Sequence, residues 1–408
     1  KIVLTITKEI KMSGAAGGAM PEGGAGGGMP GAGGMPGAGG MPGAGGGVPE
    51  GAGGMPGGGP GGASTSFKTA IYVENGKYIA EKSVAAMVTK GKVTDSSATD
   101  VRIASKEGKF NGIIVAGDSK SNYSIINPEI NLTGNGGDDT TGLGDGIVVS
   151  GKAEVTIKNA KINNTGANRS AIFVSGEGIA HIDDSEIETY NGPKDDTGSS
   201  FSAGGMMMAG PWLLGITGNV RATNIVESGT AYYTNSHIKS QAWGALSTDG
   251  PVKIRLYATK CLIETVESGY GAYSIGDCIN IFKACTFNVV DYGVILCDNS
   301  TDIFTDGTVV NSKRIGVMMH TGTGGGQLTI DKGSVFNTKD TVIQVKGRGI
   351  DILVDNAKLN TESGVILQSM ANDDPFFVAG QGDSMGAKGY SKDVNATFKN
   401  VILNGDIR

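Results

Sequence analysis

The chain has 408 residues, of which 38% are hydrophobic and only 18% charged, and its formal net charge is −6. The acidic balance, together with the lack of a Lys/Arg cluster, argues against nucleic acid or an anionic membrane as partner. No apolar run approaches the length of a membrane span. Neutral polar residues and glycine must cover much of the surface, so we expect a secreted protein that works outside the cell or on its surface. The chain begins at Lys1 rather than Met, and we expect that a signal peptide has been removed.

The first segment, residues 1–13, has the alternation of a β-strand. Ile2, Leu4 and Ile6 are separated by Val3 and Thr5, and apolar residues at every second position share one face of a strand. We therefore expect a single strand that is separated in sequence from the rest of the fold.

Residues 14–66 form a Gly/Met/Pro-rich arm. Between Gly14 and Gly62, 26 of 49 residues are glycine, and the unit Gly-Ala-Gly-Gly-Met-Pro recurs. Polyproline II has three residues per turn, so methionines that are six or nine residues apart lie on one edge of an extended segment. One interpretation is a low-complexity linker. The other is an extended arm that packs against a neighbouring subunit through its in-phase methionines, which are Met20, Met29, Met35 and Met41.

From residue 67 onward, a four-residue pattern repeats: polar, small, variable, apolar. Examples are Asn159-Ala160-Lys161-Ile162 and Asp184-Ser185-Glu186-Ile187, and the repeat length is about 22 to 26 residues. A period of this size is typical of a solenoid. We expect the apolar members to stack in one interior column, and they are Ile162, Ile187, Ile238, Ile263, Phe287, Val309, Val335 and Leu359.

These repeats resemble the coils of right-handed parallel β-helices, the pectin-lyase-like superfamily. Leucine-rich repeats need a Leu/Asn consensus that is missing, and propeller blades need about 40 residues or more. The chain is also similar to Gly-rich β-helical surface proteins of anaerobic bacteria that have no assigned activity. We thus predict an all-β fold, a right-handed parallel β-helix (a single-stranded solenoid) over residues 67–408. Loop insertions are expected near 135–145, 191–210 and 372–393.

The resemblance does not imply one function, because the superfamily includes lyases, hydrolases, adhesins and structural proteins. The Asn-Thr-Asp, Gly-His-Gly and Arg-Ile-Lys motifs of polygalacturonases are missing from this sequence. His237 occupies the variable position of the repeat, where other coils have Lys or Glu, so we expect it to face solvent. His181 and His320 have no Ser or Cys beside them in a nucleophile motif. We therefore assign no catalytic residue.

Two groups of residues remain as candidate sites. Asp138, Asp139 and Asp145 lie in a Gly-rich segment whose composition suits oxygen-only coordination of calcium, although such loops are also often only solvated. Calcium is the one cofactor we consider. Cys261 and Cys285 share the small position of the repeat one coil apart. Since neighbouring strands lie about 4.8 Å apart, they form either a stack of buried thiols or a disulfide.

The sequence favours a structural or interaction protein whose partners are copies of itself. Two features favour strand addition between subunits. One is the detached strand with Ile2, Leu4 and Ile6, and the other is a final coil without an amphipathic helix to cover it. Head-to-tail contacts of this kind need not close, and they then produce filaments. In the alternative interpretation, the chain is a fragment whose missing coils cover the last one. The second functional hypothesis is a β-helix that binds or cleaves cell-surface polysaccharide.

Overall fold

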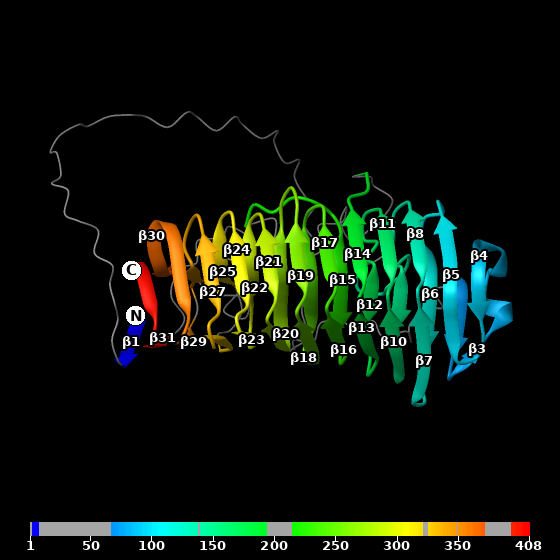
Figure 1. Cartoon of the computed structure of the whole chain (residues 1–408), viewed down its shortest axis with the longest axis horizontal. Helices are drawn as coiled ribbons and strands as arrows, with labels where there is room; N and C mark the ends of the chain where they lie inside the picture. The colour runs from blue at the N-terminus through cyan, green and yellow to red at the C-terminus, as the bar shows by residue number, and fades with distance from the viewer. Residues whose placement is uncertain are drawn as a thin grey trace, which may run out of the picture. The chain divides into compact units, whose positions relative to one another are not determined.

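The computed structural model describes residues 2–7, 67–137, 139–193, 214–320, 325–347, 349–371 and 393–408. In these residues β-strands are nearly the only regular secondary structure, and nearly all strand pairs are parallel. Figure 1 shows the strands of successive coils lying side by side along one axis. The predicted all-β solenoid is confirmed.

Each coil contributes strands to three runs of parallel pairs, here called faces A, B and C. Face A consists of β2 (Lys68–Glu74), β6 (Phe110–Ala116), β9 (Ile147–Val149), β12 (Ile172–Val174), β15 (Arg221–Val226), the first part of β18 (Gly244–Thr259) and of β20 (Tyr270–Lys283), β22 (Tyr292–Leu296), β25 (Ile315–His320), β28 (Ile343–Lys346) and the last part of β30 (Lys358–Met370).

Faces B and C follow A in each coil. Face B contains β7 (Ser121–Ile126), β10 (Ala153–Lys158), β13 (Ile179–Asp183), β16 (Thr230–Thr234), the last parts of β18 and β20, β23 (Thr301–Thr305), β26 (Gln327–Asp331), β29 (Ile350–Asp355) and β31 (Val394–Lys399). Face C contains β5 (Ser97–Ser105, which also borders face B), β8 (Glu129–Thr133), β11 (Lys161–Thr165), β14 (Glu186–Tyr190), β17 (His237–Ser240), β19 (Leu262–Thr265), β21 (Thr286–Val289), β24 (Val309–Ser312), β27 (Val335–Thr338), the first part of β30 and β32 (Ile402–Ile407).

The turn from face B to face C explains the repeated sequence pattern. Its polar residue has a positive φ, as at Asn159 (52°) and Asp184 (51°), and Asn and Asp tolerate this left-handed conformation better than most residues. The small residue that follows, such as Ala160 or Ser185, is buried between coils. The sequence pattern therefore marks a turn, and this turn directs the next apolar side chain into the interior of the solenoid.

Six of the eight residues predicted for the interior column are buried, but Val309 and Val335 are not: both are partly exposed, and their neighbours Val310 and Phe336 take the interior positions. In these two coils a second residue with positive φ, Gly307 or Gly333, follows the first. The extra turn residue moves the strand by one position. Because successive strand residues face opposite sides, a one-residue slip exchanges inside for outside.

The interior holds one continuous apolar core that runs through all the coils. Aromatic side chains pack along it: Phe304 stacks on Phe282 with ring centroids 5.0 Å apart and meets Phe336 edge to face at 5.1 Å. Part of face A is buried on its outer side as well, where Trp243, Tyr270 and Tyr292 pack with Leu214. This double burial explains the continuous apolar runs of β22 and β25, as expected for strands covered on both sides.

The corrected register is tested by truncating neighbouring residues. Phe336→Ala should lower the free energy of unfolding by about 3–5 kcal/mol, because it removes a fully buried ring. Val335→Ala should cost much less, because its side chain is partly exposed. Denaturant unfolding followed by circular dichroism measures both. An equal or larger loss for Val335→Ala would mean that the original alignment of this coil is right.

Candidate functional site

The N-terminal strand β1 (Ile2–Thr7) pairs in parallel with β31 near the other end of the chain. Ile2, Leu4 and Ile6 stand opposite Val394, Ala396 and Phe398, which are the three buried residues of β31. β31 in turn pairs with β29. Strand β1 therefore takes the place on face B that one further coil would occupy (Figure 1).

This end of the solenoid carries exposed apolar side chains. Leu4 is 41% exposed although its strand is paired, and Ile402 on β32 is 44% exposed. Among the described strands, β1 pairs with β31, and β32 pairs with β30. Each therefore presents a second edge of backbone N–H and C=O groups, and such an edge is a template for another strand. The predicted assembly residues Met20, Met29, Met35 and Met41 lie outside the described residues.

The opposite end of the solenoid is closed. Here β3 (Lys77–Tyr78), the 3-10 helices η1 (Ala80–Lys82) and η2 (Ala85–Met87), and β4 (Val88–Val93) follow β2. Tyr78, Val84 and Met87 pack against the interior core. The outermost strand β4 pairs antiparallel with β5 and exposes Lys90 and Lys92. Lysines on an edge strand oppose pairing with another chain, so the two ends differ in their capacity for strand addition.

The predicted calcium residues take part in a buried polar network. Asp139 forms an ion pair of 2.9 Å with Arg221, which also contacts Asp249 at 3.1 Å. Burial raises the pKa of Asp145, the charge of Asp139 raises it further, and Arg169 opposes both. Asp138 lies outside the described residues, within which no group of three or more metal-ligating side chains occurs. The calcium site stays a prediction.

Arg169 holds the segment around residues 134–145 against the solenoid. Its guanidinium donates hydrogen bonds to the carbonyl oxygens of Phe110 (2.8 Å), Gly144 (2.6 Å), Glu107 (2.9 Å) and Gly134. The first expected loop insertion is thus packed tightly in its described residues. Much of the other two insertions, residues 194–210 and 372–392, lies outside the described chain.

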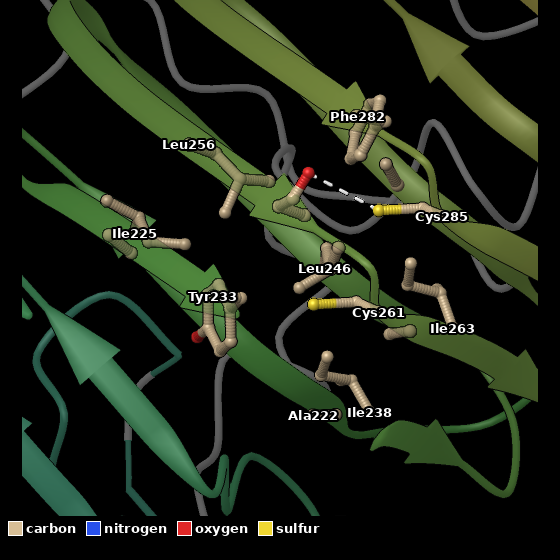
Figure 2. Close-up of a cluster of buried hydrophobic side chains, with 14 of the residues drawn as sticks. Ala222, Ile225, Tyr233, Ile238, Leu246, Leu256, Cys261, Ile263, Phe282 and Cys285 are labelled. Carbon is tan, nitrogen blue, oxygen red and sulfur yellow. Dashed lines mark hydrogen bonds between the residues drawn. The ribbon is translucent and has the colours of Figure 1, made fainter. Parts of the chain in front are cut away.

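Cys261 and Cys285 occupy equivalent positions in adjacent coils, directly before β19 and β21. Both are buried free thiols. Each thiol donates to a backbone carbonyl oxygen, Cys261 to Thr259 at 3.4 Å and Cys285 to Ala258 at 3.3 Å. The neighbouring Cys261 thiol and burial both raise the pKa of Cys285. Figure 2 shows both sulfur atoms among the interior side chains of Leu246, Ile263 and Phe282. A disulfide between them stays a prediction.

Two of the three histidines pair with carboxylates. His181 Nε2 lies 2.9 Å from Glu154, and His237 Nε2 lies 2.7 Å from Glu264. The His237 side chain is about one-third exposed, on the outer side of face C. Neither histidine meets a Ser or Cys nucleophile in these contacts.

A groove with a volume of about 630 Å³ runs along the outside of face C, across β19, β21, β24, β27 and β30. The repeat pattern did not predict it. A ladder of asparagine side chains runs along it: Asn311 donates to Asn288 (3.0 Å), Asn337 to Asn311 (2.9 Å) and Asn360 to Asn337 (2.7 Å). The signal in the sequence was an Asn directly after the interior residue of four successive coils. The four-residue repeat pattern ends one or two positions before this Asn.

Asp302 on β23 places its carboxyl group inside the solenoid. It pairs in register with Asn280 and Leu328 and is fully buried. Ser274 donates its hydroxyl to Asp302 Oδ2 at 2.7 Å. Burial raises the pKa of Asp302 to about 7, although the Ser274 hydroxyl and the nearby Asn280 amide oppose the shift.

Comparison with known proteins gave no match: no family model, no curated protein and no solved structure resembles this chain significantly. In the described residues, no helix is long and apolar enough to cross a membrane.

The buried Asp302 predicts a pH-dependent stability. Its pKa is higher in the folded state than in the unfolded state, so the folded protein binds the proton more tightly. Stability should therefore fall as pH rises from about 4 to about 7. Asp302→Asn retains an acceptor for Ser274 but cannot ionise, so it should lessen this fall and raise the melting temperature at pH 8. Thermal melts between pH 4 and 8 measure the effect.

The exposed Asp351 on β29 provides a control, and Asp351→Asn should leave the pH profile close to that of the wild type. If Asp302→Asn shows the same loss of stability with pH as the wild type, then ionisation of Asp302 does not lower the free energy of unfolding, and the prediction is wrong.

Proposed function

We propose that this protein is an extracellular structural protein that assembles with copies of itself, and that its solenoid is a right-handed β-helix of the pectin-lyase-like type. The observation that carries the proposal is the pairing of β1 with β31. A strand from one end of the sequence extends a parallel sheet at the other end, in register and with apolar residues opposite buried ones. This is strand addition, a recurrent mode of assembly between chains.

The difference between the two ends supports a directional assembly. The end formed by residues 77–93 is covered and exposes lysines on its edge strand. The end formed by β1, β31 and β32 has edge strands and the exposed Leu4 and Ile402. Contacts between unlike surfaces produce open chains when their rotation does not close a ring. Stacking of solenoid ends and packing of the Gly-rich arm through its methionines are secondary contributions that we propose, added to the strand contact and not required for it.

Polysaccharide binding is the second candidate, and the groove on face C favours it. The groove offers asparagine, threonine and serine side chains in successive coils, which suits an extended polar polymer. Its two carboxylates, Glu264 and Glu362, belong to strands four pairings apart, about 19 Å at 4.8 Å per step. Glycosidase carboxylates lie within about 10 Å of each other, so the arrangement favours binding over cleavage.

Titration calorimetry with polygalacturonate tests this second candidate. Heat of binding that Asn311→Ala reduces would support it, because Asn311 is in the middle of the ladder. If the wild type gives no heat, or Asn311→Ala binds as tightly as the wild type, the groove is not a site for this polymer.

Self-assembly is tested by removing residues 1–7. The full chain should form larger species as concentration rises, whereas the truncated chain should remain monomeric because it lacks the added strand. Sedimentation velocity and electron microscopy measure assembly, and circular dichroism verifies that the solenoid is folded. A full chain that stays monomeric at all concentrations, or a truncated chain that assembles as well as the full one, would contradict the proposal.

A further inference from the structure

We infer that β1 is an exchangeable strand: in the assembly, residues 2–7 of one copy take the place on β31 of a second copy. This inference rests on the proposed self-assembly and names the contact that makes it. The structure supplies the backbone register of that contact, and the register from Ile2 opposite Val394 to Thr7 opposite Lys399 does not depend on which chain supplies β1.

The chain between β1 and β2 is long enough for either connection. The pairings from β2 through β6, β9, β12, β15, β18, β20, β22, β25 and β28 to β30 span about 50 Å at 4.8 Å per step. Residues 8–67 separate β1 from β2, and 60 residues reach at most about 200 Å. Covalent geometry therefore allows β1 to meet β31 of its own chain or of a neighbour.

The contacts of β1 favour exchange at low cost. Among the described strands, β1 pairs with β31 alone, so releasing it leaves the pairs between the other coils intact. The same backbone pairing with β31 forms again in the neighbour, which is the basis of domain swapping. A long tether gives an effective local concentration on the order of 1 mM or below. Exchange between copies should therefore increase as the protein concentration approaches this value. A protein crowded on a surface reaches such concentrations.

Mixed single-cysteine variants detect the exchange directly. Thr5 and Thr397 stand opposite each other in the register, and strands about 4.8 Å apart are within reach of a disulfide. Thr5→Cys protein is mixed with Thr397→Cys protein at high concentration, oxidised mildly and examined by non-reducing gel and mass spectrometry. The four native cysteines are buried. We expect a disulfide between the two different chains.

Thr156→Cys is the matched control for Thr397→Cys. Both are threonines of intermediate exposure on face B, and the register places them in the same column, eight pairings apart. A mixture of Thr5→Cys and Thr156→Cys reports chance collisions only. Exchange requires the Thr397 mixture to give several-fold more heterodimer than this control. Equal yields at every concentration would overturn the inference.

Shortening the connection gives a second test. Deleting residues 12–65 leaves about 20 Å of chain between Thr7 and Lys68, too little to span the solenoid, so β1 can reach only a neighbour. We expect this variant to form oligomers at concentrations at which the full chain is monomeric. A monomeric shortened variant would overturn the inference.

A chain that carries both Thr5→Cys and Thr397→Cys separates this inference from the general proposal. Oxidised when dilute, it locks β1 onto its own β31, and it should then fail to assemble on concentration until a reductant is added. If the locked protein assembles like the wild type, exchange is wrong while self-assembly stands. If the wild type does not assemble either, the proposed function itself fails.

Discussion

Each coil of this protein has to repeat the register of the coil before it, and the rest of the structure depends on that constraint. In a parallel sheet, a shift by one residue turns every side chain to the opposite face. The turn between faces B and C maintains the register with a residue of positive φ followed by a small buried residue. At Gly307 and Gly333 the turn is one residue longer. The next strand keeps its register with its neighbours because Val310 and Phe336, one position later in the chain, point into the interior.

The same constraint explains how much of the fold the sequence predicts. The turn pattern is local, since one Asn or Asp and one small residue suffice to mark it, and so the solenoid and six of the eight interior residues follow from it. Val309 and Val335 do not, because both members of Val309-Val310 and Val335-Phe336 are apolar. Only the φ angle of the glycine decides which one is inside.

The candidate sites are less predictable, because they depend on where distant segments meet. The alternation of Ile2, Leu4 and Ile6 indicates a strand, but nothing in these residues specifies β31 as the partner of β1. Likewise Asp139 and Asp145 look like calcium ligands from the composition of their segment, whereas Asp139 lies beside Arg221, 82 positions later in the chain. Long-range contacts of this kind carry no local sequence signal.

The proposed assembly depends on β1 completing the sheet at β31. Hydrogen–deuterium exchange with mass spectrometry tests this pairing most directly, by comparing the full chain with a chain that lacks residues 1–7. Loss of protection confined to residues 394–399, with strands such as β13 and β16 unchanged, is the expected result, because only β31 loses a hydrogen-bonding neighbour. Equal protection of residues 394–399 in both chains would show that β1 does not pair there, and would contradict the account.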